Sequence, residues 1–432
     1  MARAKKEAAL TPEERLQAAL VSDWEWPYKL PENWCWTYFK SISTIQTGKK
    51  DANYGSDEGK YPFFTCAAEP IRCHGYSFDC RAILLAGNGD INNISRYNGK
   101  FEAYQRTYVV KIAEPLCFDY IFYWFKYRWF DFNKGKMFGT AIPYIRLGNL
   151  QEFPTPIPPL AEQQRIVDRI ESLFAKLDEA KEKAQAVVDS FETRKAAILH
   201  KAFTGELTKK WRKSANTRWV YKKIKDCCKL GSGGTPSRKV PDFYKGDIPW
   251  IKTGEIEWND IYDTEEKITQ SAIDNSSARC YKPGVVLVAM YGMGVTRGKA
   301  SILRVQAATN QAVCVLEPQS ALLYNRYLLY YFMRNYWDIR EKAVGGNQLN
   351  LSLTIIKELN IEIPPIDEQV EIVQILDDLF AKEQQTKEAA EAALDQIDLM
   401  KKSILARAFR GELGTNDPSE ESAVELLKRT IL

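Results

Sequence analysis

Residues 157–208, IPPLAEQQRIVDRIESLFAKLDEAKEKAQAVVDSFETRKAAILHKAFTGELT, decide the fold because they return at 363–414 as IPPIDEQVEIVQILDDLFAKEQQTKEAAEAALDQIDLMKKSILARAFRGELG. The two copies align without a gap at an offset of 206 residues, and 24 of the 52 aligned positions are identical. A repeat of this size indicates a duplicated half-molecule and not a short solenoid unit.

Apolar residues within each copy alternate at spacings of four and three, the pattern of a coiled-coil seam. In the first copy only Arg194 interrupts a predicted seam of Ile166, Ile170, Leu173, Leu177, Ala180, Ala184, Val187, Phe191 and Ile198. The second copy places on the same seam Ile372, Leu376, Leu379, Ala390, Ala393, Ile397, Met400 and Ile404, with Glu383 and Thr386 as its polar members.

The ends of both copies carry helix-boundary residues. Each copy opens after a Pro-Pro pair, which a helix tolerates only at its start, and closes on Gly205 or Gly411, the residue type favoured just past a helix end. Both copies are therefore predicted to be long helices of roughly 65 Å. An ordinary coiled-coil strut that separates two domains and binds nothing would show the same periodicity.

Composition indicates a globular protein with two or three domains. The 432 residues include 11 Trp, 22 Tyr and 19 Phe, far more aromatic residues than a disordered chain contains. The nine cysteines form no CxxC pair and there are only two histidines, so neither a disulfide framework nor a metal site is expected. Reduced cysteines, together with no apolar run near the ~18 residues of a membrane span, predict a cytoplasmic protein.

The net charge of +4 is unevenly distributed. Basic residues exceed acidic ones by 3 in residues 31–156 and by 5 in 216–362, whereas acidic residues exceed basic ones by 7 in 363–432. A polyanion would therefore meet the two globular segments and not the second helix. The bias is mild, and many proteins without a nucleic-acid partner share it.

Each long helix follows a globular module in which β-type runs alternate with Gly-rich turns. Strands are expected at 43–48, 61–66, 82–86 and 107–112 in the first module and at 285–290, 301–305 and 312–316 in the second. Each module ends in an aromatic helix, predicted over 120–131 and 327–338, and a short helix is expected at 11–20. Aromatic residues at this density could stack on bases, but a helix that is apolar nearly all round favours a core role.

The pattern predicts a mixed α/β protein with two modules and two long helices that form a coiled coil between them. If the two helices pack antiparallel, the halves are related by pseudo-twofold symmetry. Such an arrangement places the modules at opposite ends of a rod. Because the modules differ in sequence, they would match two different half-sites on duplex DNA.

The chain resembles, over almost its whole length, the specificity subunit of type I restriction-modification enzymes. The resemblance rests on the Ile-Pro-Pro, Glu-Gln and Ile-Val opening at 157–167 and 363–373, and on the Ala-Phe and Gly-Glu-Leu close of both copies. The second module adds Gly-Gly-Thr-Pro-Ser at 233–237, the run 248–254 and Thr-Asn-Gln-Ala at 309–312. In the first module, 47–53 and 61–66 are similar to another recognition variant of the same family.

The resemblance implies a non-catalytic subunit. Two target-recognition domains would each recognise half of a bipartite, asymmetric DNA site, and the helices would set the spacer and dock two methyltransferase subunits. S-adenosylmethionine and ATP would be used by the methyltransferase and restriction subunits, so no cofactor is expected in this chain. The implied domains are an N-terminal helical segment (1–30), recognition domain 1 (31–156), helical region 1 (157–213), recognition domain 2 (214–362), helical region 2 (363–414) and a C-terminal tail (415–432).

Polar loops provide the candidate DNA contacts, because Lys, Arg and hydroxyl groups contact phosphates while Arg, Asn and Gln recognise base edges. The candidates are Lys49, Lys50, Asn53, Asn88, Asn92, Lys134, Lys136, Thr235, Ser237, Arg238, Lys239, Lys252, Tyr291, Arg297, Asn347 and Gln348. The candidate partner-docking and coiled-coil residues are Glu162, Gln163, Leu173, Phe174, Glu368, Gln369, Leu379 and Phe380. For any one of the loop residues, an ordinary solvated loop is an equal alternative.

Two other functional classes stay open. A DNA-modifying enzyme would need an active site, yet neither Pro-Pro pair has the Asn/Asp-Pro-Pro-aromatic pattern of amino-methyltransferases. The Gly-rich run 292–298 resembles a phosphate loop only superficially, and Asp263, Glu265 and Lys267 match a nuclease core no better than chance in a charged loop. A protein scaffold whose modules bind only proteins would show no salt-dependent DNA binding.

Overall fold

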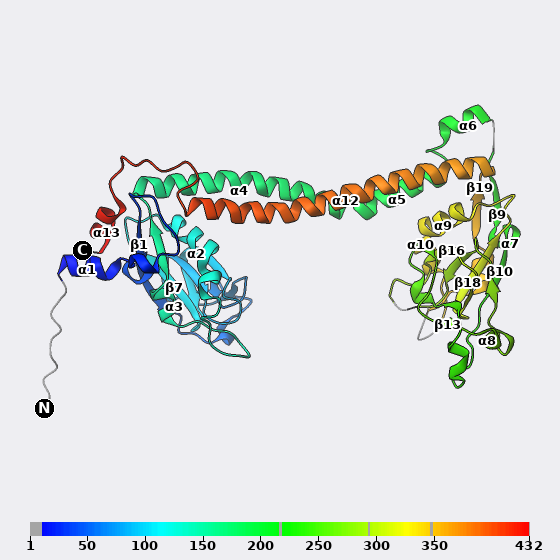
Figure 1. The fold of residues 1–432 in the computed structure, drawn as a ribbon, viewed down its shortest axis with the longest axis horizontal. Coiled ribbons are helices and arrows are strands. Elements are labelled where there is room, and N and C mark those ends of the chain that lie inside the picture. Colours follow the sequence, from blue (N-terminus) through cyan, green and yellow to red (C-terminus); the bar gives the residue numbers. More distant parts are fainter. Residues whose placement is uncertain (1–10, 216–217, 293, 346–348, 432) are drawn as a thin grey trace. The chain divides into compact units, whose positions relative to one another are not determined.

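The structure, a computed structural model, describes residues 11–215, 218–292, 294–345 and 349–431. The chain divides into two compact units: residues 1–184 with 392–432 form unit 1, and residues 185–391 form unit 2 (Figure 1). Each unit contains one α/β module and the part of the long helices that adjoins it.

Unit 1 is built on a six-stranded sheet in the order β2-β7-β5-β6-β3-β4. Neighbouring strands are antiparallel except β3 and β6, which run parallel. A separate antiparallel ribbon pairs β1 with β8. The strands are β1 (Cys35–Tyr38), β2 (Ser43–Thr47), β3 (Tyr61–Phe64), β4 (Ile71–Cys73), β5 (Phe78–Ala86), β6 (Ile94–Ala103), β7 (Thr107–Ile112) and β8 (Pro154–Ile157), and the short helices are α1 (Pro12–Ala19), α2 (Phe118–Asn133), α3 (Leu147–Gln151) and α13 (Ala423–Ile431).

Unit 2 contains a five-stranded sheet in the order β10-β18-β15-β16-β12, a four-stranded sheet in the order β13-β11-β17-β14, and the ribbon β19-β9. The strands are β9 (Val220–Lys223), β10 (Cys228–Ser232), β11 (Ile248–Ile251), β12 (Asp260–Ile261), β13 (Lys267–Ile268), β14 (Cys280–Tyr281), β15 (Val286–Ala289), β16 (Ala300–Leu303), β17 (Ala307–Thr309), β18 (Val313–Pro318) and β19 (Asn360–Ile363). Its short helices are α6 (Lys209–Ala215), α7 (Ile224–Cys227), α8 (Gln270–Asp274), α9 (Asn325–Arg334), α10 (Tyr336–Glu341) and α11 (Leu353–Lys357).

Every strand predicted from sequence overlaps an observed strand, but several strands escaped prediction. The longest of these is β6, which is buried at Ile94, alternates between half-buried and exposed side chains over 95–100, and is buried again from Phe101 to Ala103. Polar residues such as Arg96 and Asn98 therefore mask the apolar pattern on which the prediction depends.

The aromatic helices form the cores of the modules, which confirms the core interpretation over base stacking. In α2 the side chains of Tyr120, Trp124 and Trp129 are fully buried, and in α9 those of Tyr327 and Phe332 are fully buried. The second aromatic helix is shorter than predicted, because α9 ends at Arg334 and α10 begins at Tyr336. Between them, the Asn335 amide donates to the Tyr331 carbonyl at 2.8 Å.

The long helices α4 (Leu160–Asp189), α5 (Phe191–Phe203) and α12 (Ile366–Ala408) pair antiparallel, as predicted. In unit 1 Lys181 pairs with Asp398 at 3.0 Å, while Lys401 contacts Asp178, so residue numbers rise along one helix as they fall along the other. In unit 2 Arg194 pairs with Glu383 at 2.7 Å.

The first copy is not one continuous helix, which corrects the prediction. Ser190 separates α4 from α5, and its hydroxyl donates to the Ala186 carbonyl at 2.6 Å, a back-bond that bends helices. The second copy has Gln396 at this position and continues unbroken.

The seam of the paired helices differs from prediction at alternate positions. The predicted seam residues Thr386, Ala393 and Met400 are exposed, and Lys387, Leu394 and Lys401 are half-buried in their place. The first copy shows the same shift, from Ala180 to Lys181. Lysine can occupy a seam because its aliphatic stem covers apolar surface. The Lys387 ammonium lies 5.0 Å from the Phe191 ring centre, and that of Lys401 lies 5.1 Å from Phe174.

The two terminal segments fold together in unit 1. The predicted N-terminal helix is confirmed as α1, where Thr11 and Glu14 form a reciprocal capping box. The segment expected as a tail contains α13, which packs against α1 and buries Leu426 and Leu427 (Figure 1). A helix of nine residues is too short to show a decisive period in sequence.

Candidate nucleic-acid interface and helix surface

Two of the predicted polar loops lie at one edge of the unit 1 sheet. β2 and β5 end at this edge, and β7, which lies antiparallel between them, begins there. The Gly48 amide donates to the Thr107 carbonyl at 3.2 Å, and the Gly87 amide donates to the Arg106 carbonyl at 2.8 Å. The loops that carry the predicted residues Lys49, Lys50, Asn53, Asn88 and Asn92 therefore start on either side of the turn that precedes β7.

The cations at this edge are available to an external anion. Lys49, Lys50 and Arg106 take part in none of the ion pairs within the described part of unit 1. The Lys50 ammonium instead lies 4.5 Å from the Tyr54 ring centre. Arg106 was not predicted; it lines a cavity of about 330 Å³ with Thr47, Gln105 and Tyr108. Only tertiary structure brings it beside the predicted loops.

The third predicted loop of unit 1 follows α2. Lys134 and Lys136 are exposed, and the Lys136 ammonium lies 3.6 Å from the Phe132 ring centre. The chain then reaches Tyr144, which forms a β-bridge with Asn88 at the edge described above.

In unit 2 the turn 309–312 connects the predicted loops. The Gly234 amide donates to the Thr309 carbonyl at 2.9 Å, the Asn310 amide donates to Ile251 at 3.0 Å, and the Met290 amide donates to Ala312 at 2.9 Å. The loops that carry Thr235, Lys252 and Tyr291 therefore leave from one turn. The side chain of Asn310 accepts from the Ala312 amide at 3.1 Å, which is a structural role.

Glu266 orients two of the predicted cations in unit 2. Its carboxylate pairs with Lys252 at 2.7 Å and with Arg238 at 2.7 Å. The hydrogen bond from Lys252, helped by Arg238, lowers the pKa of Glu266, and the same bond raises the pKa of Lys252. The Arg238 guanidinium also lies 4.0 Å from the Tyr244 ring centre. A phosphate would have to compete with Glu266 for Arg238 and Lys252. Within the described part of unit 1, the cations Lys49, Lys50 and Arg106 have no such competing carboxylate.

The remaining unit 2 candidates fall into three groups. Ser237 and Lys239 are exposed, and Thr235 contacts Gln311 through its hydroxyl. Tyr291 is partly exposed, while Arg297 donates to the Leu349 carbonyl and has its pKa lowered by burial and by Arg340. Arg340 was not predicted; it donates to the Arg297 carbonyl at 2.6 Å. Asn347 and Gln348 lie outside the described residues.

The two modules share one construction despite their diverged sequences. A Cβ added to Gly48 would meet the Ala103 carbonyl oxygen at 1.8 Å, and a Cβ added to Gly233 would meet the Thr309 carbonyl oxygen at 1.8 Å. Only glycine permits so close an approach of two backbone segments. In each module the carbonyl ends a strand, β6 or β17, that pairs parallel with another strand. Equivalent frames therefore carry different polar loops.

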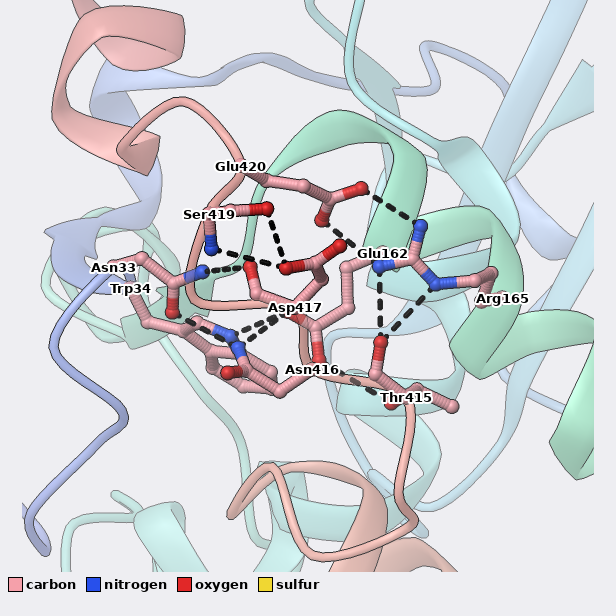
Figure 2. A network of polar contacts seen from close by, with 9 residues as sticks. All are labelled: Asn33, Trp34, Glu162, Arg165, Thr415, Asn416, Asp417, Ser419 and Glu420. Carbon is pink, nitrogen blue, oxygen red and sulfur yellow. Dashed lines mark hydrogen bonds and ion pairs between the residues drawn. The ribbon is translucent and has the colours of Figure 1, made fainter.

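The four predicted residues at the starts of the long helices are buried. Gln163 accepts from the Cys117 amide at 2.9 Å and Gln369 accepts from the Tyr324 amide at 2.8 Å, so each glutamine holds the start of an aromatic helix. Glu162 accepts hydrogen bonds from Trp34, Asn416 and Thr415 at 2.8, 2.9 and 3.2 Å (Figure 2). Glu368 accepts from Thr208 at 2.7 Å and from Arg212 at 2.9 Å. All four side chains are thus buried by groups of this chain, and their docking role stays a prediction.

The other four helix candidates are half-buried: Leu173, Phe174, Leu379 and Phe380. The Phe174 ring centre lies 6.0 Å from that of Tyr123, and the Phe380 ring centre lies 5.6 Å from that of Tyr330. Both phenylalanines thus attach the helix to its own module. Exposed apolar side chains on α12 include Val370 near its start and Leu399 and Met400 further along, which are 39%, 57% and 50% exposed.

Within the described part of the chain, no group of three or more His, Cys, Asp or Glu side chains could hold a metal ion. None of the helices described here is both long and apolar enough to span a membrane. Two equivalent modules with different polar loops, each attached to a long helix, define a duplicated two-module binding protein.

The family model for the type I restriction modification DNA specificity domain matches residues 31–188 and 216–394. The chain belongs to this family and is a specificity subunit of a type I restriction-modification system. Its role is DNA target recognition, and catalysis lies with other subunits.

Two specificity subunits are similar to this chain in sequence, and a solved structure is similar to it in fold. The type I restriction enzyme EcoDI specificity subunit of Escherichia coli is 27% identical over 414 residues, which cover 89% of this chain and 90% of that protein. The EcoKI specificity subunit of Escherichia coli K12 is 27% identical over 292 residues, covering 64% of this chain and 61% of that protein. The HsdS subunit from Thermoanaerobacter tengcongensis superposes with a TM-score of 0.59 at 18% identity, covering 90% of this chain and 99% of that one.

Proposed function

We propose that the modules at 31–156 and 214–362 each recognise one half of a bipartite, asymmetric DNA site. The observation that carries this proposal is the pair of equivalent backbone contacts, Gly48 with Ala103 and Gly233 with Thr309, beneath different polar loops. A common frame presents each set of loops in the same way, while different side chains meet different bases. Lys49, Lys50 and Arg106 would contact phosphates in one half-site, and Arg238 and Lys252 would act in the other.

The helical regions at 157–213 and 363–414 set the spacer between the half-sites and dock two methyltransferase subunits. The open apolar side chains Leu399 and Met400 favour this role, because exposed apolar residues on a paired helix mark contact surfaces. Those subunits use S-adenosylmethionine, and the restriction subunits that join the complex consume ATP. The complex acts on DNA in the cytoplasm.

Mapping of methylated adenines across a genome tests the proposal. The chain is expressed with its methyltransferase partner, and the control culture carries the methyltransferase alone. We expect a two-part motif with a fixed gap that depends on this chain. A contiguous motif, or no methylation that depends on the chain, would contradict the proposal.

A further inference from the structure

Each module contacts its long helix through a tyrosine and a carboxylate. In unit 1 the Tyr123 hydroxyl donates to Glu171 of α4 at 3.3 Å, and in unit 2 the Tyr330 hydroxyl donates to Asp377 of α12. The tyrosines correspond at the 207-residue offset of the aromatic helices, and the acids correspond at the 206-residue offset of the long helices. The same contact therefore occurs twice.

In unit 1 two arginines from the sheet extend this contact. Arg81 on β5 pairs with Asp119, in the first turn of α2, at 2.5 Å. Arg96 on β6 contacts Asp119 as well, and its guanidinium lies 3.8 Å from Glu171 on α4. Arg96 thus connects the sheet, the aromatic helix and the long helix. Its guanidinium also lies 4.8 Å from the Phe122 ring centre, which restricts its position.

In unit 2 the charges are exchanged. Arg326 on α9 stands at the position that corresponds to Asp119, and it pairs with Asp260 on β12 at 3.0 Å. Arg304, just after β16, pairs with Asp260 at 3.2 Å. Arg326 also lies 3.7 Å from Asp377 of α12. An arginine again reaches the acid of the long helix, but it comes from the aromatic helix and not from the sheet.

Each cluster contains two arginines and two carboxylates, so both are charge-balanced although their members come from different elements. Apolar packing alone would fix neither the number nor the signs of these charges. Single exposed ion pairs contribute little, but a network of planar guanidinium groups between three elements restricts their directions. Asp119 and Asp260, at the centres of the two networks, are 23% and 22% exposed.

We propose that these two clusters are positioning joints: Arg96 and Arg326 fix the direction of each module against its own helix, and thereby the DNA gap at which both half-sites are met. This inference rests on the proposed recognition of a bipartite site. The joints touch no DNA. Their effect is on which gap is accepted and not on which bases are recognised.

The mildest test replaces the helix acids by their amides, Glu171→Gln and Asp377→Asn, which keep the shape and remove the charge. The complex reconstituted with methyltransferase is given duplexes with the native gap and with gaps one base pair shorter or longer. We expect each variant to methylate the native duplex while its preference for the native gap relaxes about tenfold, which is about 1.4 kcal/mol. Arg429→Asp, which breaks the exposed Arg429–Glu421 pair of the tail, is the control and should leave the preference unchanged.

A charge exchange in unit 2 gives a second, independent test. Arg326→Asp alone places three acids together and should relax the gap preference further. Adding Asp260→Arg recreates the arrangement of unit 1 and should restore most of the preference. Helix content and the unfolding midpoint establish that each variant is folded.

Two results would overturn the joints while leaving the proposed function intact. One is an unchanged gap preference in the folded amide variants. The other is an equal fall in methylation of all the duplexes, which would indicate a merely structural role. A wild-type complex with no preference for any gap would instead refute the proposed bipartite recognition itself.

Discussion

The corresponding buried acids of the two units, Glu162 and Glu368, receive their hydrogen bonds from different parts of the chain. In unit 2 Glu368 accepts hydrogen bonds from Thr208 and Arg212, which belong to the stretch that leads from α5 toward β9. In unit 1 the corresponding Glu162 accepts from Trp34, near the N-terminus, and from Thr415 and Asn416, near the C-terminus (Figure 2). One continuous stretch of chain serves unit 2, whereas two separate ends must meet in unit 1.

This difference makes unit 1 dependent on contacts that hold the tail in place. Arg165 binds Glu420 with two hydrogen bonds of 2.8 Å, and the Asn33 side chain donates to the Asp417 carbonyl at 3.0 Å (Figure 2). The Tyr28 hydroxyl also donates to the Phe409 carbonyl at 2.8 Å. The donors to Glu162 lie far apart in the chain, and closing a long loop costs more conformational entropy than ordering one short stretch. Unit 1 should therefore be the easier unit to open.

Removal of the tail should have the largest effect. A chain that ends at Gly414 loses two donors to Glu162 and the buried Leu426 and Leu427. We expect unit 1 to lose about 5 kcal/mol, the sum of two buried leucines and of the two hydrogen bonds that Glu162 loses. Hydrogen exchange resolved by unit measures this loss. Equal loss of protection in unit 2 would contradict the comparison.

Substitution of the two close-approach glycines should affect the units alike. Gly48→Ala and Gly233→Ala each place a methyl group against a backbone carbonyl that cannot move aside, so each should cost its own unit about 3 kcal/mol. Gly254→Ala, where an added Cβ meets no atom within 4 Å, is the control. Denaturant unfolding measures the cost, and a tolerated substitution in either module would show that the frames are not equivalent.

Neutralising the two buried acids should cost unit 2 more stability than unit 1. Glu368→Gln removes the charge that Arg212 faces and should cost about 2 kcal/mol. Glu162→Gln faces neutral donors and should cost less than about 1 kcal/mol. Urea unfolding of the two variants at neutral pH gives both values. The reverse order of cost would contradict the contrast between the two acids.

The pH dependence of Glu162 sharpens this contrast. Burial raises its pKa above the ordinary value of 4.5, against the opposing hydrogen bonds from Trp34, Asn416 and Thr415. The folded state therefore holds this proton more tightly, so the contribution to stability is largest below pH 4.5 and falls as pH rises through the folded-state pKa. Relative to Glu162→Gln, the wild type should gain stability as pH falls from 7 toward 4.5. A difference that is constant over this range would contradict the raised pKa.

The smallest expected effect concerns the seam between the paired long helices. Met400→Lys should change the stability of the isolated chain by less than about 0.5 kcal/mol, because Met400 is exposed and Lys401 covers the seam. Ile397→Lys, at a buried seam position, is the matched variant and should cost several times more. Thermal unfolding distinguishes the two, and equal costs would restore the seam predicted from sequence.

The repeat and the hydrophobic pattern predict the elements well because both are local. The long helices, the aromatic helices and the strand-rich modules follow from spacing along the chain. The predicted seam was wrong at alternate positions because the aliphatic stems of lysines can replace apolar residues there. A prediction that counts only apolar residues does not include this possibility. The apolar spacing runs from Val187 to Phe191 across the break at Ser190, so periodicity does not predict the break.

The candidate site was less predictable because its residues meet only in three dimensions. Arg106 and Arg340 join the predicted loops through tertiary contacts, so spacing along the chain gave no sign of them. Glu162 and Gln163 were singled out correctly as a repeated pair, but repetition does not distinguish a docking residue from a buried structural one. A polar pair kept identical at the start of two amphipathic helices was the available signal for a structural role.

Removing candidate base contacts from one module at a time tests most directly whether the two modules recognise separate halves of the DNA site. Asn53→Ala with Asn92→Ala alters unit 1, and Arg238→Ala alters unit 2, while methylated adenines are mapped for each variant. We expect each variant to lose base preference in one half of the motif only, and the two variants to affect opposite halves. Loss in both halves together, or in the same half for both variants, would contradict recognition by two independent modules.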